Sequence, residues 1–134
     1  MNRWLAIFVV AVILGVTLGV RTEGMQEVCV CPFYSLVMAQ EQPEVYRSML
    51  MNVFLFVPFG LSISQNTPER WAGRKRFICV VFCSLILSCF VETMQFFLCL
   101  GRTEVDDIIM NTLGGAIGAA SVFGEKDLFV DKRP

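Results

Sequence analysis

The sequence predicts an all-α protein of the polytopic membrane class, a bundle of about four transmembrane helices. Of its 134 residues 55% are apolar, the mean hydropathy is +0.63 and only 17% are charged, against about 25% in soluble domains. The charges fall between long apolar segments, and about 20 apolar residues carry a helix across a bilayer. Four such helices use most of the length, so we expect residues 1–134 to form one membrane domain.

The composition also excludes several kinds of chemistry. Histidine is absent, which excludes Ser-His-Asp and Cys-His catalysis, HExxH metal sites and histidine proton relays. Any acid–base chemistry would therefore depend on carboxylates. No basic tract indicates nucleic acid as a partner, and we expect neither a metal nor another cofactor. The lipid bilayer is the partner that the composition predicts.

The first predicted helix covers residues 4–20. Its length suits the apolar part of a signal peptide, but no small-residue cleavage site follows and three further apolar segments come later. We therefore interpret it as a retained helix. Gly15 and Gly19 form a GxxxG pair, which permits close approach of a neighbouring helix and hence a homo-oligomer.

The next segment, residues 21–48, is polar apart from residues 32–39, which are too few to span a membrane. That short piece fits either an interfacial or re-entrant segment or an ordinary loop. Cys29 and Cys31 lie in the same segment, but their CxC spacing would strain a mutual disulfide, and we assign them no role.

Three more helices follow, at about residues 49–64, 77–100 and 107–123. The first of them contains Pro58, which is tolerated in membrane helices and is expected to cause a kink. A tight loop, residues 101–106, joins the last two. Four cysteines of the 77–100 helix are interpreted as small packing residues: Cys79, Cys83, Cys89 and Cys99.

The distribution of lysine and arginine predicts the orientation in the membrane. With both termini in the cytoplasm, eight cations lie inside and three outside, and the opposite topology inverts this bias. We therefore predict an N-in, C-in arrangement. The inner cations are Arg3, Arg70, Arg74, Lys75, Arg76, Lys126, Lys132 and Arg133, and the outer ones are Arg21, Arg47 and Arg102.

Glu92 is a charged residue inside a predicted membrane helix, where an acid costs about 2.5–3.5 kcal/mol on insertion scales and usually faces the bundle interior. It belongs to a polar face at helical spacing: Ser84, Ser88, Glu92, Gln95 and Cys99. The last helix carries a matching face of polar and small residues: Asp107, Asn111, Gly114, Gly118 and Ser121. We expect the two faces to meet, with glycines allowing close contact.

Helical rise places these polar residues in the outer half of the membrane. Glu92 lies roughly 12 Å, Gln95 about 7 Å and Asn111 about 6 Å below the outer ends of their helices, and Asn52 about 4–5 Å below its own. The sequence thus predicts one polar pocket that opens to the extracytoplasmic side.

Arg102 is the expected counter-ion of Glu92, Asp106 or Asp107. A second interpretation of the acids is local: Thr103 and Asp106 fit a capping box at the start of the last helix, where acids are also favoured by the helix dipole. A buried structural ion pair between Glu92 and Arg102 is a further alternative.

The same residues resemble the VanZ-like family over about residues 46–122. Its first signature matches Asn52-Val-Phe-Leu-Phe-Val-Pro58-Phe-Gly60. The central E-x-x-Q helix motif matches Glu92-Thr-Met-Gln95. The third matches Arg102-Thr-Glu-Val-Asp106-Asp107, which continues as D-x-x-x-N-x-x-G through Asn111 and Gly114. Order and spacing agree, and the motifs show no departure from the pattern.

This resemblance implies a multi-pass protein of the cell membrane that lowers susceptibility to teicoplanin and related lipoglycopeptides. We expect Asn52, Gln95 and Asn111 to hydrogen-bond the polar part of a lipid-linked or amphiphilic ligand. Arg102 would meet an anion, and Glu92 would set the charge of the pocket. Asp106 and Asp107 complete the expected set of ligand-binding residues. Pro58, Gly60, Gly114 and Gly118 are expected to be structural.

Two other functions stay open at this point. In an intramembrane enzyme, Glu92 would be the general acid or base, and Asp106 and Asp107 could hold a divalent cation over a phosphate. In a structural membrane subunit, the polar cluster would only hold the helices together. Substitution of Glu92 or Asp107 would then lower the amount of folded protein rather than a specific activity.

Overall fold

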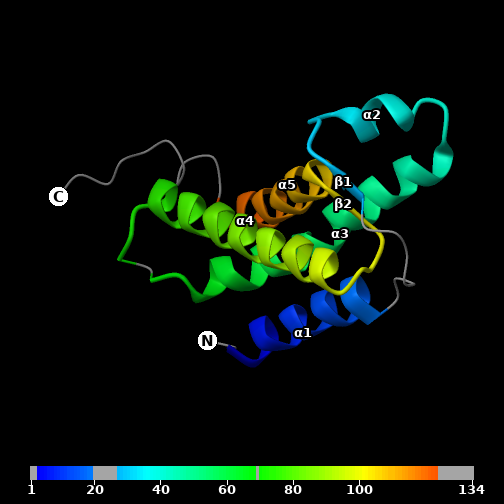
Figure 1. Ribbon diagram of the computed structural model, residues 1–134. Coiled ribbons are helices and arrows are strands. Elements are labelled where there is room, and N and C mark those ends of the chain that lie inside the picture. Colours follow the sequence, from blue (N-terminus) through cyan, green and yellow to red (C-terminus); the bar gives the residue numbers. More distant parts are fainter. Residues whose placement is uncertain (1–2, 20–26, 69, 124–134) are drawn as a thin grey trace.

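The chain folds into a helical bundle with a small two-stranded sheet at one end (Figure 1). This computed structural model describes residues 3–19, 27–68 and 70–123. In chain order the elements are α1 (Arg3–Gly19), β1 (Glu27–Cys29), α2 (Tyr34–Met38), α3 (Pro43–Asn66), α4 (Gly73–Phe97), β2 (Arg102–Glu104) and α5 (Val105–Val122).

The four long helices run alternately up and down the bundle (Figure 1). The start of α1, the α3–α4 connection and the end of α5 lie at one end. The opposite end carries β1, β2 and α2. All four predicted long helices are therefore present among the described residues, with bounds shifted by a few residues.

The largest shift is at the start of α3, which begins at Pro43 rather than at residue 49. The preceding residue, Gln42, has an extended backbone. Proline is well suited to the first turn of a helix, because the N–H that it lacks would have no partner there. The helix α3 therefore includes the polar segment 43–48. At the other end of the hairpin, α4 stops at Phe97 instead of residue 100. Cys99 and Gly101 have positive φ, which ends the helix before the connection to β2.

The strands correct the purely helical prediction. β1 and β2 pair in parallel, with Val28 opposite Thr103 and Cys29 opposite Glu104. Residues 102–104, predicted as part of a tight loop, are thus a strand that ties the segment before α2 to the start of α5. The short apolar piece 32–39 contains the five-residue helix α2.

Two of the described helices, α3 and α4, are long and apolar enough to cross a membrane. The apolar part of α1, Trp4–Gly19, is shorter. In α5, Asp106, Asp107 and several glycines dilute the apolar residues.

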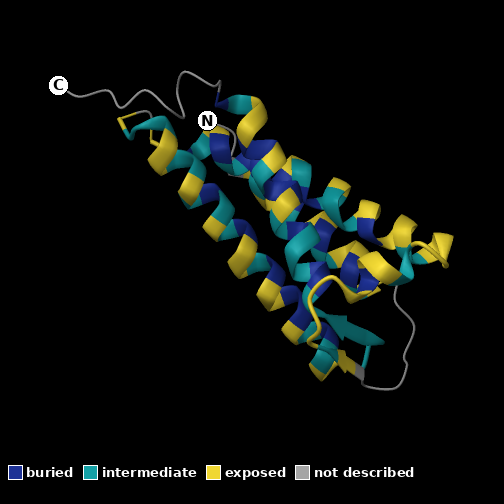
Figure 2. Cartoon of the chain, turned by 90° about the horizontal axis from the view of Figure 1, so that it is seen from above, coloured by how far each residue is buried: buried dark blue, intermediate teal, exposed yellow. Residues whose placement is uncertain are grey.

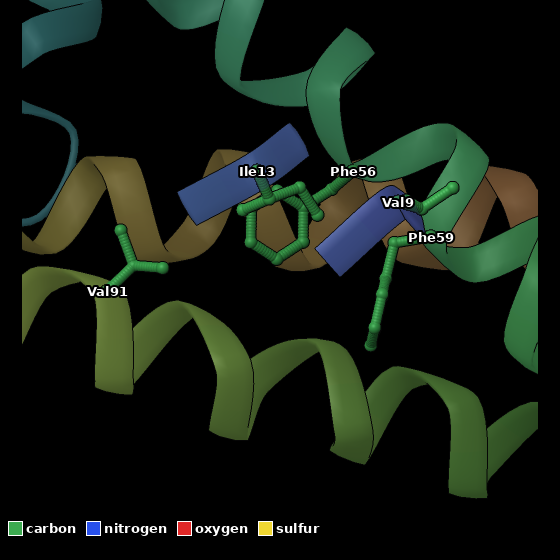
Figure 3. Close-up of a cluster of buried hydrophobic side chains, with 5 residues drawn as sticks. All are labelled: Val9, Ile13, Phe56, Phe59 and Val91. Atoms are coloured by element: carbon green, nitrogen blue, oxygen red, sulfur yellow. The ribbon is translucent and has the colours of Figure 1, made fainter. Parts of the chain in front are cut away.

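An apolar cluster fixes α1 against α3 and α4. Val9 and Ile13 of α1 lie beside Phe56 and Phe59 of α3, and Val91 of α4 closes the group (Figure 3). The rings of Phe56 and Phe59 pack edge to face, with their centroids 6.0 Å apart. A second, smaller cluster packs Val80 of α4 against the last turns of α5.

Besides these apolar clusters, the bundle buries many polar side chains and exposes many large apolar ones. The residues buried between the helices include many polar side chains: Ser62, Ser64, Ser84, Ser88, Glu92, Gln95, Asp106, Asp107 and Asn111. The exposed sides of the same helices carry large apolar ones: Phe8, Phe54, Ile78, Phe82, Ile86 and Phe90. Figure 2 shows exposed positions, in yellow, on the outside of the helices. Exposure of so many large apolar side chains indicates contact with lipid or with a partner.

Close contact between α3 and α5 depends on glycine. A Cβ added at Gly118 would lie 2.1 Å from the carbonyl oxygen of Val57, and one at Gly114 would lie 2.2 Å from that of Val53. A Cβ on Gly60 of α3 would meet the carbonyl oxygen of Gly115 at 2.1 Å. The structural role predicted for these glycines is therefore backbone-to-backbone packing.

The GxxxG pair of α1 is different. Nothing lies within 4 Å of a Cβ added at Gly15 or Gly19. Within the described residues the pair therefore brings no helix close, and the homo-oligomer stays a prediction.

This contrast predicts unequal effects of the same substitution. Gly118→Ala should destabilise the bundle by about 1–3 kcal/mol because a methyl group forces α5 away from α3, whereas Gly15→Ala should be neutral or slightly stabilising because alanine favours the helix. Reversible unfolding in mixed micelles, followed by circular dichroism, measures both. Equal stability of the two variants would contradict the packing described here.

Candidate functional site

The polar face of α4 points into the bundle. Ser84, Ser88, Glu92 and Gln95 are all at most 3% exposed. Cys99, predicted as the last member of this face, lies beyond the end of α4 and is only half-buried. Gln95 Nε2 donates to the backbone oxygen of Thr17 at 3.1 Å, which links α4 to α1.

The facing side of α5 contributes the second half of the polar interior. Asn111 Nδ2 donates to Ser88 Oγ at 2.9 Å, so the two polar faces meet as the helical spacing predicted. Asp107, Gly114 and Gly118 are also buried, but Ser121 is exposed and bonds to its own helix instead.

Asn52 joins α3 to the start of α5. Its Nδ2 donates to Asp107 Oδ1 at 2.6 Å. Asp107 is 6% exposed and lies in the first turn of α5, where the helix dipole favours a negative charge. This bond brings the first and third sequence motifs together.

Glu92 reaches the connection between β2 and α5. Its Oε2 accepts from the backbone N–H of Glu104 at 3.3 Å. Because α4 ends at Phe97, Glu92 lies about 7–8 Å from the helix end, shallower than the sequence predicted. This bond connects the E-x-x-Q motif, which begins at Glu92, to the motif that begins at Arg102.

Asp106 corrects the predicted capping box. Its Oδ1 accepts from the N–H of Phe33 at 2.6 Å and its Oδ2 from that of Ser35 at 2.7 Å. Phe33 and Ser35 lie at the start of α2, so Asp106 satisfies backbone N–H groups at the N-terminus of a helix that is about 70 residues away in the sequence. No side-chain bond caps α5 at Glu104, and the Thr103 hydroxyl is buried without a hydrogen-bond partner. Ser35 Oγ also donates to Glu104, which fastens α2 to β2.

Arg102 forms an ion pair with Glu104, in which Arg102 Nε lies 3.2 Å from Glu104 Oε1. Its guanidinium carbon also lies 5.1 Å from the centre of the Tyr34 ring. A hydrogen bond with Cys29, the residue opposite Glu104 in the sheet, is the main cause of the raised pKa of Arg102, and the charge of Glu104 adds to it. Glu104, which is not among the counter-ions expected from the sequence, is therefore one partner of this cation.

A cavity of about 520 Å³ opens at this end of the bundle. Arg102 and Asp107 line it. The other predicted ligand-binding residues are not among its lining residues and instead make the bonds to other helices and to β2 described above. The remaining wall comes mostly from α3 and from the segments next to β2: Ser35, Gln42, Glu44, Val45, Ser48, Met49, Leu100, Gly101 and Glu104.

Two separate reasons explain why several cavity residues are not predicted from the sequence. Glu44, Val45 and Ser48 looked like loop positions, because the apolar pattern of the second span begins only at Met49. Pro43 at the start of a helix was the available signal. Ser35 gave no signal, since its position depends on the distant carboxylates of Asp106 and Glu104.

The chemistry that this arrangement supports is polar recognition. Within the described residues, no group of three or more cysteine, aspartate or glutamate side chains has the geometry to hold a metal ion. Asp106, proposed from sequence as a cation ligand, uses both oxygens on backbone amides. Asp107 and Glu104 stay exposed to the cavity beside Arg102.

Comparison with known proteins identifies relatives of this sequence. The sequence model of the VanZ/LLP1 family matches residues 4–126. A curated protein of Enterococcus faecium, named Protein VanZ, is 37% identical over 74 residues. The alignment covers 54% of this chain and 42% of that protein, so less than half of the relative's length is matched. No solved structure matches the chain.

The bond between Asn52 and Asp107 should be measurable as a coupling energy. In a double-mutant cycle of Asn52→Ala and Asp107→Ala, we expect about 1 kcal/mol of coupling in the free energy of unfolding. Asn52→Ala combined with Thr93→Ala is the control, because Thr93 is exposed and bonds only within α4. That pair should be additive within about 0.5 kcal/mol. Coupling no larger than in the control would contradict the contact.

Proposed function

The chain belongs to the VanZ/LLP1 family, and on this premise we propose that it is a multi-pass cell-membrane protein that lowers susceptibility to teicoplanin and related lipoglycopeptides. The relationship to the enterococcal protein and the resemblance of the three motifs support the proposal. Because less than half of that relative is aligned, the activity is proposed for this chain and has to be tested on it.

In the proposed topology α1, α3, α4 and α5 each cross the membrane, with both termini in the cytoplasm. The alternating directions of the helices and their exposed apolar side chains support four crossings (Figure 1). The cations of the α3–α4 connection and the tail favour this orientation through the positive-inside rule. The cavity then opens on the extracytoplasmic side.

The observation that carries the proposal is the meeting of all three motifs beside one cavity. Asn52 bonds to Asp107, Glu92 bonds to the backbone of Glu104, and Asp107 lines the wall together with Arg102. We propose that the cavity binds a lipid-linked or amphiphilic ligand. In this account Arg102 and Asp107 contact the ligand, and Asn52 and Glu92 position them.

Buried bonds between helices favour one competing function, that of a structural membrane subunit. Asn111 with Ser88 and Gln95 with Thr17 join helices at a distance from the cavity. The enzyme alternative is weaker, because Glu92 is 3% exposed and is not among the residues that line the cavity.

Drug susceptibility tests the proposal. A sensitive bacterial host would express the wild-type chain, Asp107→Asn, Glu92→Gln or the control Glu41→Gln, which removes an exposed carboxylate outside the cavity. At matched membrane levels, the wild type and the control should raise tolerance to teicoplanin more than to vancomycin. Asp107→Asn and Glu92→Gln should lose the effect, because each weakens a contact between two motifs.

The competing functions give different results. A structural subunit predicts that the two site variants reduce the amount of folded protein and that tolerance follows that amount alone. Unchanged susceptibility with well-expressed wild type would show that tolerance to these drugs is not the function of this chain.

A further inference from the structure

The segment around α2 directs its apolar side chains away from the bundle. Val30, Phe33 and Val37 are 69%, 57% and 62% exposed. Val28, Tyr34 and Leu36 are exposed as well, and residues 28–39 contain no charged side chain. An uncharged stretch with this much exposed apolar surface marks a site of contact with a membrane or a partner.

The contacts that this segment makes with the bundle are hydrogen bonds. Ser35 Oγ donates to Glu104, and the carboxylate of Asp106 accepts from the N–H groups of Phe33 and Ser35 at 2.6 and 2.7 Å. Of the residues of α2, Ser35 alone is buried. The polar side of the segment therefore faces the bundle and the apolar side faces away, which is the arrangement of an interfacial amphipathic segment.

The backbone of the segment finds acceptors within the chain. The start of a helix leaves N–H groups without an intrahelical partner, and Asp106 accepts from two of them, those of Phe33 and Ser35. The N–H of Val37 donates to the carbonyl oxygen of Phe33 at 3.3 Å, and the N–H groups of residues 39–42 all donate to carbonyl oxygens of α2. These donors do not depend on water, which lowers the cost of placing the segment against lipid.

The segment also continues the exposed apolar surface of α3. Figure 1 shows α2 beside the first turns of α3, and α3 is one of the two described helices long and apolar enough to cross a membrane. Tyr46, Leu50 and Phe54 are exposed at helical spacing and so form one face along α3. We infer that residues 28–39 lie in the membrane–water interface, with lipid as the partner of their exposed side chains. The inference goes beyond the proposed function, which assigns no role to α2.

The chemistry of the segment indicates how deep it lies. Residues 30–33 belong to neither helix nor strand, and irregular backbone does not face lipid within the hydrocarbon core. Tyr34 and Tyr46 are exposed aromatic residues with a hydroxyl group, and tyrosine is enriched at the level of the lipid head groups. The apolar side chains should therefore reach about 5–10 Å into the boundary between head groups and acyl chains.

Single tryptophans would report the surroundings of the segment. In a full chain whose Trp4 and Trp71 are replaced by phenylalanine, Phe33→Trp would be reconstituted in phosphatidylcholine vesicles. Phe54→Trp, at the middle of α3, is the control for the hydrocarbon core, and Gln40→Trp, exposed in the turn after α2, is the control for water. Fluorescence quenching would be compared for lipids brominated near the head group, lipids brominated near the chain end, and aqueous iodide.

The tryptophan at position 33 should be quenched about twofold more strongly by the shallow bromines than by the deep ones, because an interfacial segment does not reach the bilayer centre. Iodide should quench it at least about threefold less than it quenches Gln40→Trp, because lipid shields the side chain. Phe54→Trp should show the opposite dependence on bromine depth. Val37→Trp repeats the measurement on the same segment if the left-handed backbone of Phe33 does not accept tryptophan.

Three results would overturn the inference. Iodide quenching equal to that of Gln40→Trp, without quenching by either brominated lipid, would place the segment in water. Shielding from iodide and from both lipids would show that a second copy of the chain or another part of the protein covers it. Stronger quenching by the deep bromines would show a segment inserted into the hydrocarbon core.

This experiment separates the inference from the proposed function, because no drug enters the measurement. Failure of α3 to cross the membrane would be seen at Phe54→Trp, whereas failure of the inference would be seen only at positions 33 and 37. Lipid contact of the segment in a chain that leaves teicoplanin tolerance unchanged would retain the inference and reject the function.

Discussion

The bundle depends on the backbone contact between α3 and α5. Gly60, Gly114 and Gly118 remove the side chains that would otherwise keep these helices apart, and the carbonyl oxygens of Val53 and Val57 occupy the space. At this separation the amide of Asn52 reaches the carboxylate of Asp107. The contact therefore sets the position of α5, and with it the strand β2 and one wall of the cavity. Between helices in a membrane the hydrophobic effect is weak, because the lipid is itself apolar, and van der Waals attraction between closely packed backbones then contributes to helix association.

The polar interior follows from this arrangement. Buried polar groups are costly unless they are paired, and the described contacts pair most of them across helices. Asn111 bonds to Ser88, Gln95 to the backbone of α1, and Asp106 to the first amides of α2. Each of these bonds joins segments that are far apart in the chain. Because hydrogen bonds need specific partners and apolar contacts do not, the polar groups determine which helix faces lie against each other. Asp107, on the same polar face of α5 as Asn111, lines the cavity together with Arg102.

The sequence was sufficient for the helices and for the two polar faces, because both follow from local periodicity. The contact of Asn111 with Ser88 could be predicted from helical spacing alone. The pairing of β1 with β2 could not, since each strand has three residues and its partner lies about 75 residues away. For the same reason the local sequence predicts Asp106 as a cap of α5, whereas its carboxylate accepts from the backbone N–H groups of Phe33 and Ser35. Glu92 lies nearer the helix end than the sequence predicts, because α4 ends at Phe97 and not at residue 100.

Oxidative cross-linking tests the central claim that α5 presents its polar face to the polar face of α4. In a chain whose native cysteines are replaced, Ser88→Cys with Asn111→Cys should form a disulfide in the membrane faster than the control pair, because Asn111 Nδ2 lies 2.9 Å from Ser88 Oγ and the two positions therefore face each other. Phe90→Cys with Asn111→Cys should not, since Phe90 lies exposed on α4. Cross-linking of the Phe90 pair as fast as the Ser88 pair, or of neither pair, would contradict the account.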